Sequence, residues 1–171
     1  MTFNELAQTR YSVRKFSPKP VPPEKLNAVL EAARLAPTAK NLQAYHIYVV
    51  NSPEGMEKMR QLTPCHYGAP TVLIFTKNTQ EEWHHPQEQE RTSGVQDASI
   101  VATHVMLAAT EQGLGTCWLN FFSPKEVSRA YRLPDYEIPV LLMPIGYAAA
   151  DCTPADRHQE RKDLKDVVTY L

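Results

Sequence analysis

The chain has 171 residues, and its 18 Lys and Arg residues nearly balance 19 Asp and Glu residues, which leaves a formal net charge of −1 at pH 7. A chain of this length suits one domain whose folding buries roughly 70% of the unfolded surface, so we expect a single domain over residues 1–171. The near-neutral charge excludes the strong basic field that recruits nucleic acid. No basic start precedes an apolar run, and no apolar stretch reaches the roughly 18 residues of a membrane span, so we expect a soluble, cytoplasmic protein with no membrane partner.

The first half of the chain predicts helices that alternate with strands. Thr2 and Glu5 form a capping box at the start of a short helix that leads to Arg10. A second helix begins at Pro22, since proline suits the first turn, and should end at Ala36 because a proline follows. The patterns further along predict a strand, a helix and a buried strand over residues 45–50, 52–62 and 71–76, respectively.

The second half opens with a strongly polar segment, residues 78–94, which predicts a loop or a solvated short helix. Apolar residues surround the helix expected over residues 97–112 almost completely, so this helix should be buried, and Gly113 ends it. The remaining elements are a short strand, a helix with a capping box at Ser123 and Glu126, an apolar strand, and a strand or extended arm, over residues 116–119, 123–131, 138–147 and 163–171.

The cysteines and histidines predict neither a disulfide framework nor a metal site. Cys65, Cys117 and Cys152 are odd in number, widely separated and without C-x-x-C spacing, so we expect them to be reduced and structural. His84 and His85 are adjacent and have no third ligand at a fixed short spacing. Because adjacent side chains in a helix or strand point apart, we expect these histidines on the surface and no bound metal.

Residues 10–16 bring together two guanidinium groups and two hydroxyl groups, those of Arg10, Arg14, Tyr11 and Ser12. Two arginines on a well-placed turn can hold a phosphate through paired N–H donors. The alternative is a pair of solvated arginines that complement a helix end. A second basic pair, Arg161 and Lys162, allows the same two interpretations, anion binding or a solvated face.

Two further segments could border a ligand. Residues 36–45 contain small residues, a proline and two amides that suit the approach of a planar ligand, although an ordinary polar loop fits equally well. Residues 113–120 lack the G-x-G-x-x-G pattern of a nicotinamide-binding fold; a glycine helix stop before a core strand explains Gly113 and Gly115, and Trp118 is free to line a pocket. No G-x-S-x-G elbow or Cys/His arrangement supports covalent hydrolysis.

In their order along the chain, these segments resemble the FMN-dependent nitroreductase family. Residues 10–16 resemble its R-R-S-x-R-x-F opening, and residues 36–45 resemble its A-P-S-x-x-N-x-Q-P-W loop. Residues 97–118 are similar to its long helix and G-L-G-x-C-W turn, and Arg161 with Lys162 is similar to its C-terminal basic segment. The resemblance covers nearly the whole chain.

This resemblance implies an α+β fold, with a central, mixed and mostly antiparallel sheet flanked by helices, and a homodimer with two FMN molecules at its interface. The helix over residues 97–112 could then pack against its dimer mate. By this resemblance, the FMN phosphate would be held by Arg10, Ser12 and Arg161, and the pyrimidine edge of the flavin would face Arg14. The partner subunit would supply the loop beside the flavin. The full set of cofactor-binding residues that the resemblance implies is Arg10, Tyr11, Ser12, Arg14, Pro37, Thr38, Ala39, Asn41, Gln43, Trp118, Leu119, Asn120 and Arg161.

The chemistry that the resemblance implies is a ping-pong cycle with NADH or NADPH as the donor. The flavin accepts a hydride, and a nitroaromatic, a quinone or a similar electron-poor acceptor then receives the electrons. Arg14 is the expected catalytic residue, because a guanidinium stabilises negative charge on the reduced flavin, and no acid or base is assigned. A specialised dehalogenase or dehydrogenase, or an FMN storage or redox-sensing module without turnover, are the alternatives.

Two departures from the family pattern affect the expected pocket. Tyr45 stands where tryptophan is usual, and Asn120 stands where glycine or glutamate is common. Residues 78–94 form the only segment that is long and polar enough to act as a lid.

Overall fold

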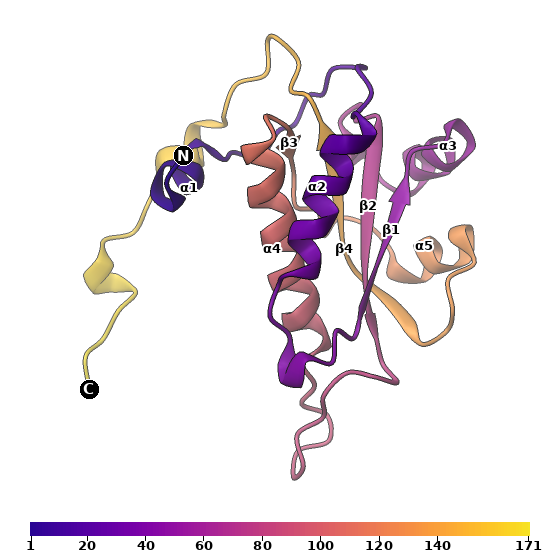
Figure 1. The fold of residues 1–171 in the computed structure, drawn as a ribbon, viewed down its shortest axis with the longest axis vertical. Helices are drawn as coiled ribbons and strands as arrows, with labels where there is room; N and C mark the ends of the chain where they lie inside the picture. Colours follow the sequence, from indigo (N-terminus) through magenta and orange to yellow (C-terminus); the bar gives the residue numbers. More distant parts are fainter.

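The computed structural model describes residues 1–171 as helices packed on both faces of one four-stranded sheet (Figure 1). All three neighbouring strand pairs are antiparallel, and a single parallel bridge joins Ser12 to Thr116 beside them. The predicted α+β class with a mostly antiparallel sheet is confirmed, and its parallel part is this one bridge. The strand order across the sheet is β1 (Tyr45–Val50), β2 (Thr71–Asn78), β4 (Glu137–Gly146) and β3 (Gly115–Thr116).

The helices cover the sheet because the two faces of its strands are both apolar. On β2, Leu73 and Phe75 join the core under α2 and α4, whereas Val72 and Ile74 join the core under α3 and α5. Successive strand residues point to opposite faces, so a fully apolar strand needs a helical layer on each side. The helices are α1 (Phe3–Thr9), α2 (Pro23–Arg34), α3 (Pro53–Leu62), α4 (Gly94–Glu111) and α5 (Pro124–Tyr131), with short 3-10 helices η1 (Ala39–Asn41), η2 (Pro64–His66), η3 (Asp156–Gln159) and η4 (Leu164–Asp166).

Helix α4 is the central helix. Its apolar sequence predicted burial on all sides, but one side is exposed. One face, which includes Val101, Val105 and Ala109, is completely buried against α2 and the sheet. On the other side, Val95 and Ile100 stay 53% and 38% exposed. A single chain therefore leaves part of an apolar helix uncovered, which the sequence pattern alone could not distinguish from full burial in one core.

Most predicted elements are present, and their ends differ by a few residues. The capping box of Thr2 and Glu5 is formed at α1. Helix α2 ends at Arg34 rather than Ala36, since Leu35 is already its C-cap. Helix α4 begins three residues earlier than predicted, at Gly94, where an added Cβ would lie 1.9 Å from Glu82 Oε2. Only a glycine fits this close approach.

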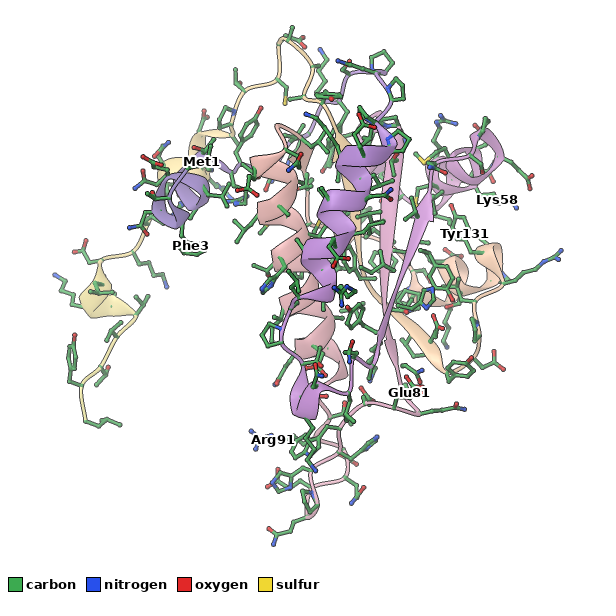
Figure 2. The ribbon with its side chains drawn as sticks, viewed as in Figure 1. Met1, Phe3, Lys58, Glu81, Arg91 and Tyr131 are labelled. Atoms are coloured by element: carbon green, nitrogen blue, oxygen red, sulfur yellow. The ribbon has the colours of Figure 1, made fainter.

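The C-terminal segment, for which the sequence predicted a strand or an extended arm, forms no strand. Residues 163–171 contain only the short turn η4 and are exposed throughout, and none of their backbone groups pairs with a strand. Alternating apolar residues form a strand only where a neighbouring strand edge pairs with them, and no such edge lies beside this segment. Residues 163–171 therefore correspond to the alternative, an extended arm, which runs away from the sheet in Figure 1. Figure 2 shows Met1, just before α1, and Phe3, its first residue, at the same side of the molecule.

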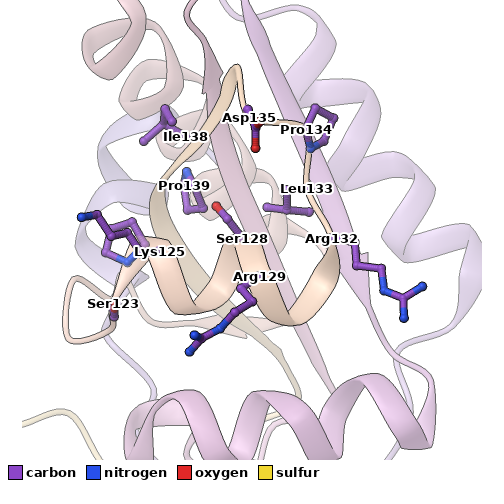
Figure 3. A pocket seen from close by; sticks show the side chains of 11 residues that line it. Ser123, Lys125, Ser128, Arg129, Arg132, Leu133, Pro134, Asp135, Ile138 and Pro139 are labelled. Carbon is purple, nitrogen blue, oxygen red and sulfur yellow. The ribbon is translucent and has the colours of Figure 1, made fainter.

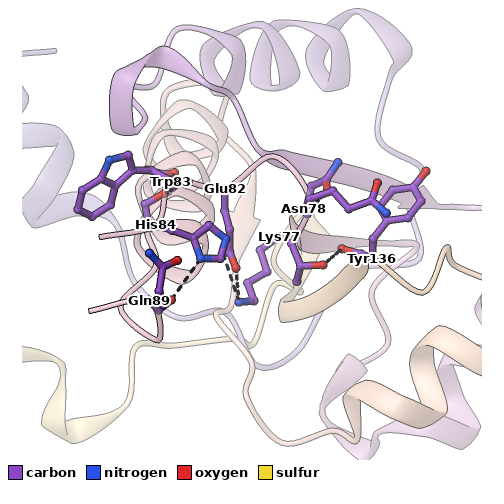
Figure 4. Close-up of polar contacts among 11 residues, drawn as sticks. Lys77, Asn78, Glu82, Trp83, His84, Gln89 and Tyr136 are labelled. Atoms are coloured by element: carbon purple, nitrogen blue, oxygen red, sulfur yellow. Dashed lines mark hydrogen bonds and ion pairs between the residues drawn. The ribbon is translucent and has the colours of Figure 1, made fainter. Parts of the chain in front are cut away.

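The polar segment after β2 is a loop rather than a short helix. Lys77 Nζ lies 3.0 Å from Glu82 Oε1 in an ion pair that is largely buried (Figure 4). The Trp83 N–H donates to Ser93 Oγ, and the Ser93 N–H donates to the Trp83 carbonyl. An isolated bridge between His84 and Thr92 closes the outer part. The loop is thus held at its base by specific pairs and projects beyond the N-terminal end of α4 (Figure 1).

The turn at η2 makes the stability of the fold sensitive to pH. Burial, and to a smaller extent the Arg60 guanidinium, lowers the pKa of His66, and its Nδ1 accepts a hydrogen bond from the Gly68 N–H at 3.0 Å. The folded state prefers the neutral ring, so this contribution is fully present above the unfolded pKa of about 6.5 and is lost as pH falls through the lower folded pKa. We expect His66→Asn, which keeps an acceptor, to remove this part of the pH dependence. Urea unfolding at about pH 7.5 and about pH 5.5 measures this pH dependence in wild type and in His66→Asn. If both proteins lose the same stability between the two pH values, the assignment is contradicted.

Candidate functional site

A cavity of about 230 Å³ lies where the start of the chain meets its C-terminal segment. Half of the residues around it are arginines, and they come from positions about 150 residues apart in the chain, by the numbering of the two segments. The contact of the Tyr11 ring with the His158 ring, with centroids 6.2 Å apart, joins the two segments directly. The lining residues are Arg10, Tyr11, Ser12, Arg14, Ala155, Arg157, His158 and Arg161.

The N-terminal wall is placed by an extended segment that follows α1. Arg10 is the C-cap of α1, and the Val13 N–H then donates to the Thr116 carbonyl at 2.9 Å, next to the bridge between Ser12 and Thr116. Val13 is 1% exposed and anchors this segment in the core. Because neighbours in an extended chain point to opposite sides, Ser12 and Arg14 lie on the face away from Val13, toward the cavity.

The C-terminal wall is built around the short helix η3. The Arg161 guanidinium donates to the carbonyl groups of His158 and Glu160 at 2.7 and 2.6 Å, and these bonds set its position. Arg157 and His158 were missed by the sequence reasoning, which considered only the adjacent pair Arg161 and Lys162. No local pattern marks them, because Arg157 lies in the short 3-10 helix η3 and Arg161 lies beyond its end.

The charge of the cavity is strongly positive and has no internal counter-charge. No Asp or Glu lines it, and none of its four arginines forms an ion pair with a carboxylate of the chain. Guanidinium groups offer forked N–H donors that match phosphate oxygens, and the Ser12 and Tyr11 hydroxyls add donors of their own. The residues present therefore fit a phosphate monoester, which carries up to two negative charges.

Arg14 lines this cavity and also acts on a neighbouring buried thiol. Burial raises the pKa of the Cys117 thiol, and the Arg14 guanidinium opposes that rise. Burial likewise raises the pKa of Tyr67, with Arg14 again acting in the opposite direction. Arg14 thus lies close to the segment after α4 as well as to the cavity. Cys65, Cys117 and Cys152 are all free thiols.

The loop after α2 has an unusual backbone. It lies at the N-terminal end of α4, whereas Arg10 lies beside Thr110, near the other end of this helix. Lys40, Asn41 and Gln43 have φ values of 51°, 55° and 55°, in the left-handed region. The Gln43 N–H donates to Thr38 Oγ1 at 3.0 Å, and the Ala39 N–H donates to Asp97 Oδ1 at 2.9 Å. These bonds define the loop conformation. Of the predicted site residues, Pro37, Thr38, Ala39, Asn41 and Gln43 do not line the arginine cavity of the same chain.

The segment after Gly115 packs mainly against the two cores of the fold. Trp118 is half-buried and packs against the core under α2 and α4. Leu119 is buried in the opposite core, and both of its backbone groups bond Leu142, at 2.9 and 3.1 Å. The side chain of Asn120 is exposed.

A larger depression, of about 730 Å³, lies beside α5 (Figure 3). Its residues all come from one stretch of the chain, 123–139, and include Lys125, Arg129 and Arg132 as well as Asp135. Volume alone does not make it the better candidate, because its charges are mixed and it gathers no residues from distant segments. The arginine cavity is therefore the stronger candidate site.

Residues 1–171 contain no group of three or more His, Cys, Asp or Glu side chains that could hold a metal ion. No helix combines the length and the apolar character needed to cross a membrane.

Comparison with known proteins gives the family of the chain. The model of the nitroreductase family matches residues 7–65 and 63–147. A protein of Methanothermobacter thermautotrophicus with the provisional name NADH dehydrogenase/NAD(P)H nitroreductase is 31% identical over 156 residues, which is 85% of this chain and 76% of that protein. The crystal structure of a nitroreductase family protein from Clostridium difficile 630 is similar with 34% identity and a TM-score of 0.92, over 99% of this chain and 98% of that chain. A provisional nitroreductase from Exiguobacterium sibiricum 255-15, crystallised in complex with FMN, has the same fold, with a TM-score of 0.84 and 20% identity over 100% of this chain and 98% of that one. The chain therefore belongs to the nitroreductase family.

Proposed function

We propose that the protein is an FMN-dependent oxidoreductase that uses NADH or NADPH to reduce nitroaromatic, quinone or related electron-poor acceptors. The observation that carries this proposal is the cavity with four arginines and no carboxylate, which fits the phosphate of FMN. The name of the relative from Methanothermobacter thermautotrophicus and the FMN complex of the protein from Exiguobacterium sibiricum support the same reading. When bound, FMN supplies the two-electron chemistry, because its ring can take a hydride from a nicotinamide and pass the electrons to an acceptor.

The residues of the cavity divide into a phosphate-binding set and one group nearer the ring. Arg10, Ser12 and Arg161 would hold the phosphate, and Arg157 would add a further guanidinium to it. Arg14 would lie at the pyrimidine edge of the flavin, since it reaches from the cavity toward Cys117. There it would stabilise the negative charge that two-electron reduction places on that edge.

Arg14→Ala is expected to lower the midpoint potential of the bound flavin by about 30 mV, which corresponds to a tenfold change in a two-electron equilibrium. Turnover should slow as well, because reduction becomes less favourable. Arg14→Lys, which keeps a positive charge, should recover part of the potential. The potential is measured by equilibration with a reference dye during anaerobic reduction. An unchanged potential in Arg14→Ala would contradict the role.

We also propose that the working unit is a homodimer in which each flavin site uses residues of both chains. The N-terminal end of α4 holds the loop through Asp97, whereas Thr110, near the other end, lies beside Arg10. Asp97 and Thr110 are thirteen residues apart on one helix, which is about 20 Å. A loop this distant cannot touch a phosphate held by the arginines of its own chain. The exposed apolar residues of the C-terminal arm, Leu164, Val167 and Tyr170, are a surface that a second copy could cover.

The proposal is tested with purified protein that is incubated with FMN and then desalted. The protein should stay yellow, lose its colour with NADH or NADPH under anaerobic conditions, and regain it when a nitroaromatic or a quinone is added. A yellow protein that neither nicotinamide bleaches would be an FMN-binding module without turnover. A protein that retains no FMN would remove the proposal altogether.

A further inference from the structure

We propose that Asp97 is a positioning residue that holds the loop after α2 and the loop after β2 in one fixed arrangement beside the flavin ring. This inference rests on the proposed function, because the flavin site includes the loop of residues 37–43 of the partner chain only under the proposed homodimer. Asp97 touches neither the arginine cavity nor its residues. It would therefore act through the two loops on the flavin ring and on acceptor binding, and not on the phosphate.

Asp97 first contacts the loop after α2. Asp97 lies in the first turns of α4 and is 3% exposed. Its Oδ1 accepts a hydrogen bond from the Ala39 N–H at 2.9 Å. The partner position is the first residue of η1, so one buried carboxyl group fixes the point where that loop turns.

The same carboxyl group also contacts the other loop. The Ser93 hydroxyl donates to Asp97 Oδ2 at 2.7 Å, and the Ser93 Oγ accepts from the Trp83 N–H at 3.2 Å. The Ser93 N–H donates in turn to the Trp83 carbonyl at 3.0 Å. Figure 4 shows Trp83 on this loop, next to the ion pair of Lys77 and Glu82. Both oxygens of Asp97 are thus used, one for each loop.

The loop after α2 needs such an external hold because its backbone is unfavourable by itself. Three residues without glycine's freedom, Lys40, Asn41 and Gln43, adopt left-handed φ values within four positions. Side chains with a Cβ avoid this region, so the conformation persists only where surrounding contacts impose it. Asp97 supplies the side-chain hydrogen bond to this loop from another segment, whereas Thr38, whose Oγ1 accepts from the Gln43 N–H, belongs to the loop itself. Loss of the Asp97 carboxyl group should let the loop relax.

The variant that tests this is Asp97→Ala in the full chain, with Asp97→Asn as the conservative change. An asparagine oxygen can accept from the Ala39 N–H while its amide donates to Ser93 Oγ, so Asp97→Asn should restore what Asp97→Ala loses. Ser99→Ala is the matched control, since the Ser99 hydroxyl only bonds the Val95 carbonyl on the same helix. Ala39→Pro removes the same hydrogen bond from the other side, because proline has no N–H to donate to Asp97, and it leaves α4 unaltered.

The first measurement is amide hydrogen exchange of the protein without FMN. In Asp97→Ala, exchange in residues 38–43 and at Trp83 should accelerate together by about tenfold, the size expected for one lost buried hydrogen bond, and Ser99→Ala should change neither. Ala39→Pro should accelerate residues 40–43 in the same way. Because no FMN is needed, this result is independent of the proposed function. Unchanged exchange in both loops would overturn the inference.

The second measurement uses FMN-loaded protein. Asp97→Ala should alter the visible circular dichroism of the flavin and raise KM for the acceptor by about tenfold, with kcat changed much less. Inorganic phosphate should compete with FMN equally well in wild type and variant. A variant that only unfolds more easily, with dichroism and KM as in wild type, would show a merely structural role and contradict the inference. If wild-type protein binds no FMN, the proposed function fails and the exchange experiment still decides whether Asp97 joins the loops.

Discussion

Arg10→Ala combined with Arg161→Ala is expected to weaken FMN binding by about a thousandfold. The two arginines come from opposite walls of the cavity, and no carboxylate of the chain compensates either of them. A hydrogen bond to a charged group contributes about 2 kcal/mol, so losing both contacts costs about 4 kcal/mol. Each single variant should lose about thirtyfold by the same reasoning. Quenching of FMN fluorescence on titration gives the dissociation constants.

The matched control is the pair Arg129→Ala and Arg132→Ala. These arginines line the larger depression beside α5, so the control removes the same net charge from another surface. It should leave FMN binding within about twofold of wild type, apart from a small long-range effect that salt screens. If the control weakens FMN as much as the cavity variant, general charge rather than the cavity attracts FMN.

Gly115→Ala is expected to weaken FMN binding, because it displaces the cavity wall that packs on this glycine. A Cβ at this position would lie 2.4 Å from Val13 Cγ2 and 3.0 Å from Val13 Cβ. Val13 is buried and cannot rotate into free space, so the segment that carries Ser12 and Arg14 must move. Overpacking of this kind costs about 1–3 kcal/mol of folding stability, and displacement of the cavity wall should weaken FMN binding by about tenfold or more. Urea unfolding and FMN titration measure the two effects.

A compensating change separates this mechanism from general damage. Val13→Ala removes the methyl groups that the new Cβ would meet, so Gly115→Ala with Val13→Ala should bind FMN better than Gly115→Ala alone. The double variant is still less stable than wild type, since a buried side chain is smaller. If Gly115→Ala binds FMN like wild type, or if the second change brings no recovery, the wall is not positioned through Val13.

The sequence predicted those features that depend on neighbouring residues. The capping box at Thr2 and the apolar runs of β2 and β4 are local patterns, and the structure has them. Five of the predicted site residues also line one cavity, namely Arg10, Tyr11, Ser12, Arg14 and Arg161. Their grouping was expected through the resemblance to a family, because nothing local to residues 10–16 indicates that residue 161 lies beside them.

Other features depend on contacts between distant segments, and the sequence could not show them. Arg157 joins the cavity only because η3 folds beside Tyr11. The bond between Ala39 and Asp97 spans 58 positions, so neither residue alone indicates it. Both backbone groups of Leu119 pair with Leu142, on the distant strand β4. The C-terminal arm has an apolar alternation that finds no strand to pair with in this chain.

The most direct test of the central claim compares FMN with riboflavin, which has the same ring and no phosphate. If the arginine cavity holds the phosphate, FMN should bind at least about a hundredfold more tightly than riboflavin, and inorganic phosphate should compete with FMN and not with riboflavin. Removal of Arg10 and Arg161 should bring the two affinities close together. Equal affinities of wild-type protein for FMN and riboflavin, with no effect of phosphate, would contradict the assignment of the cavity.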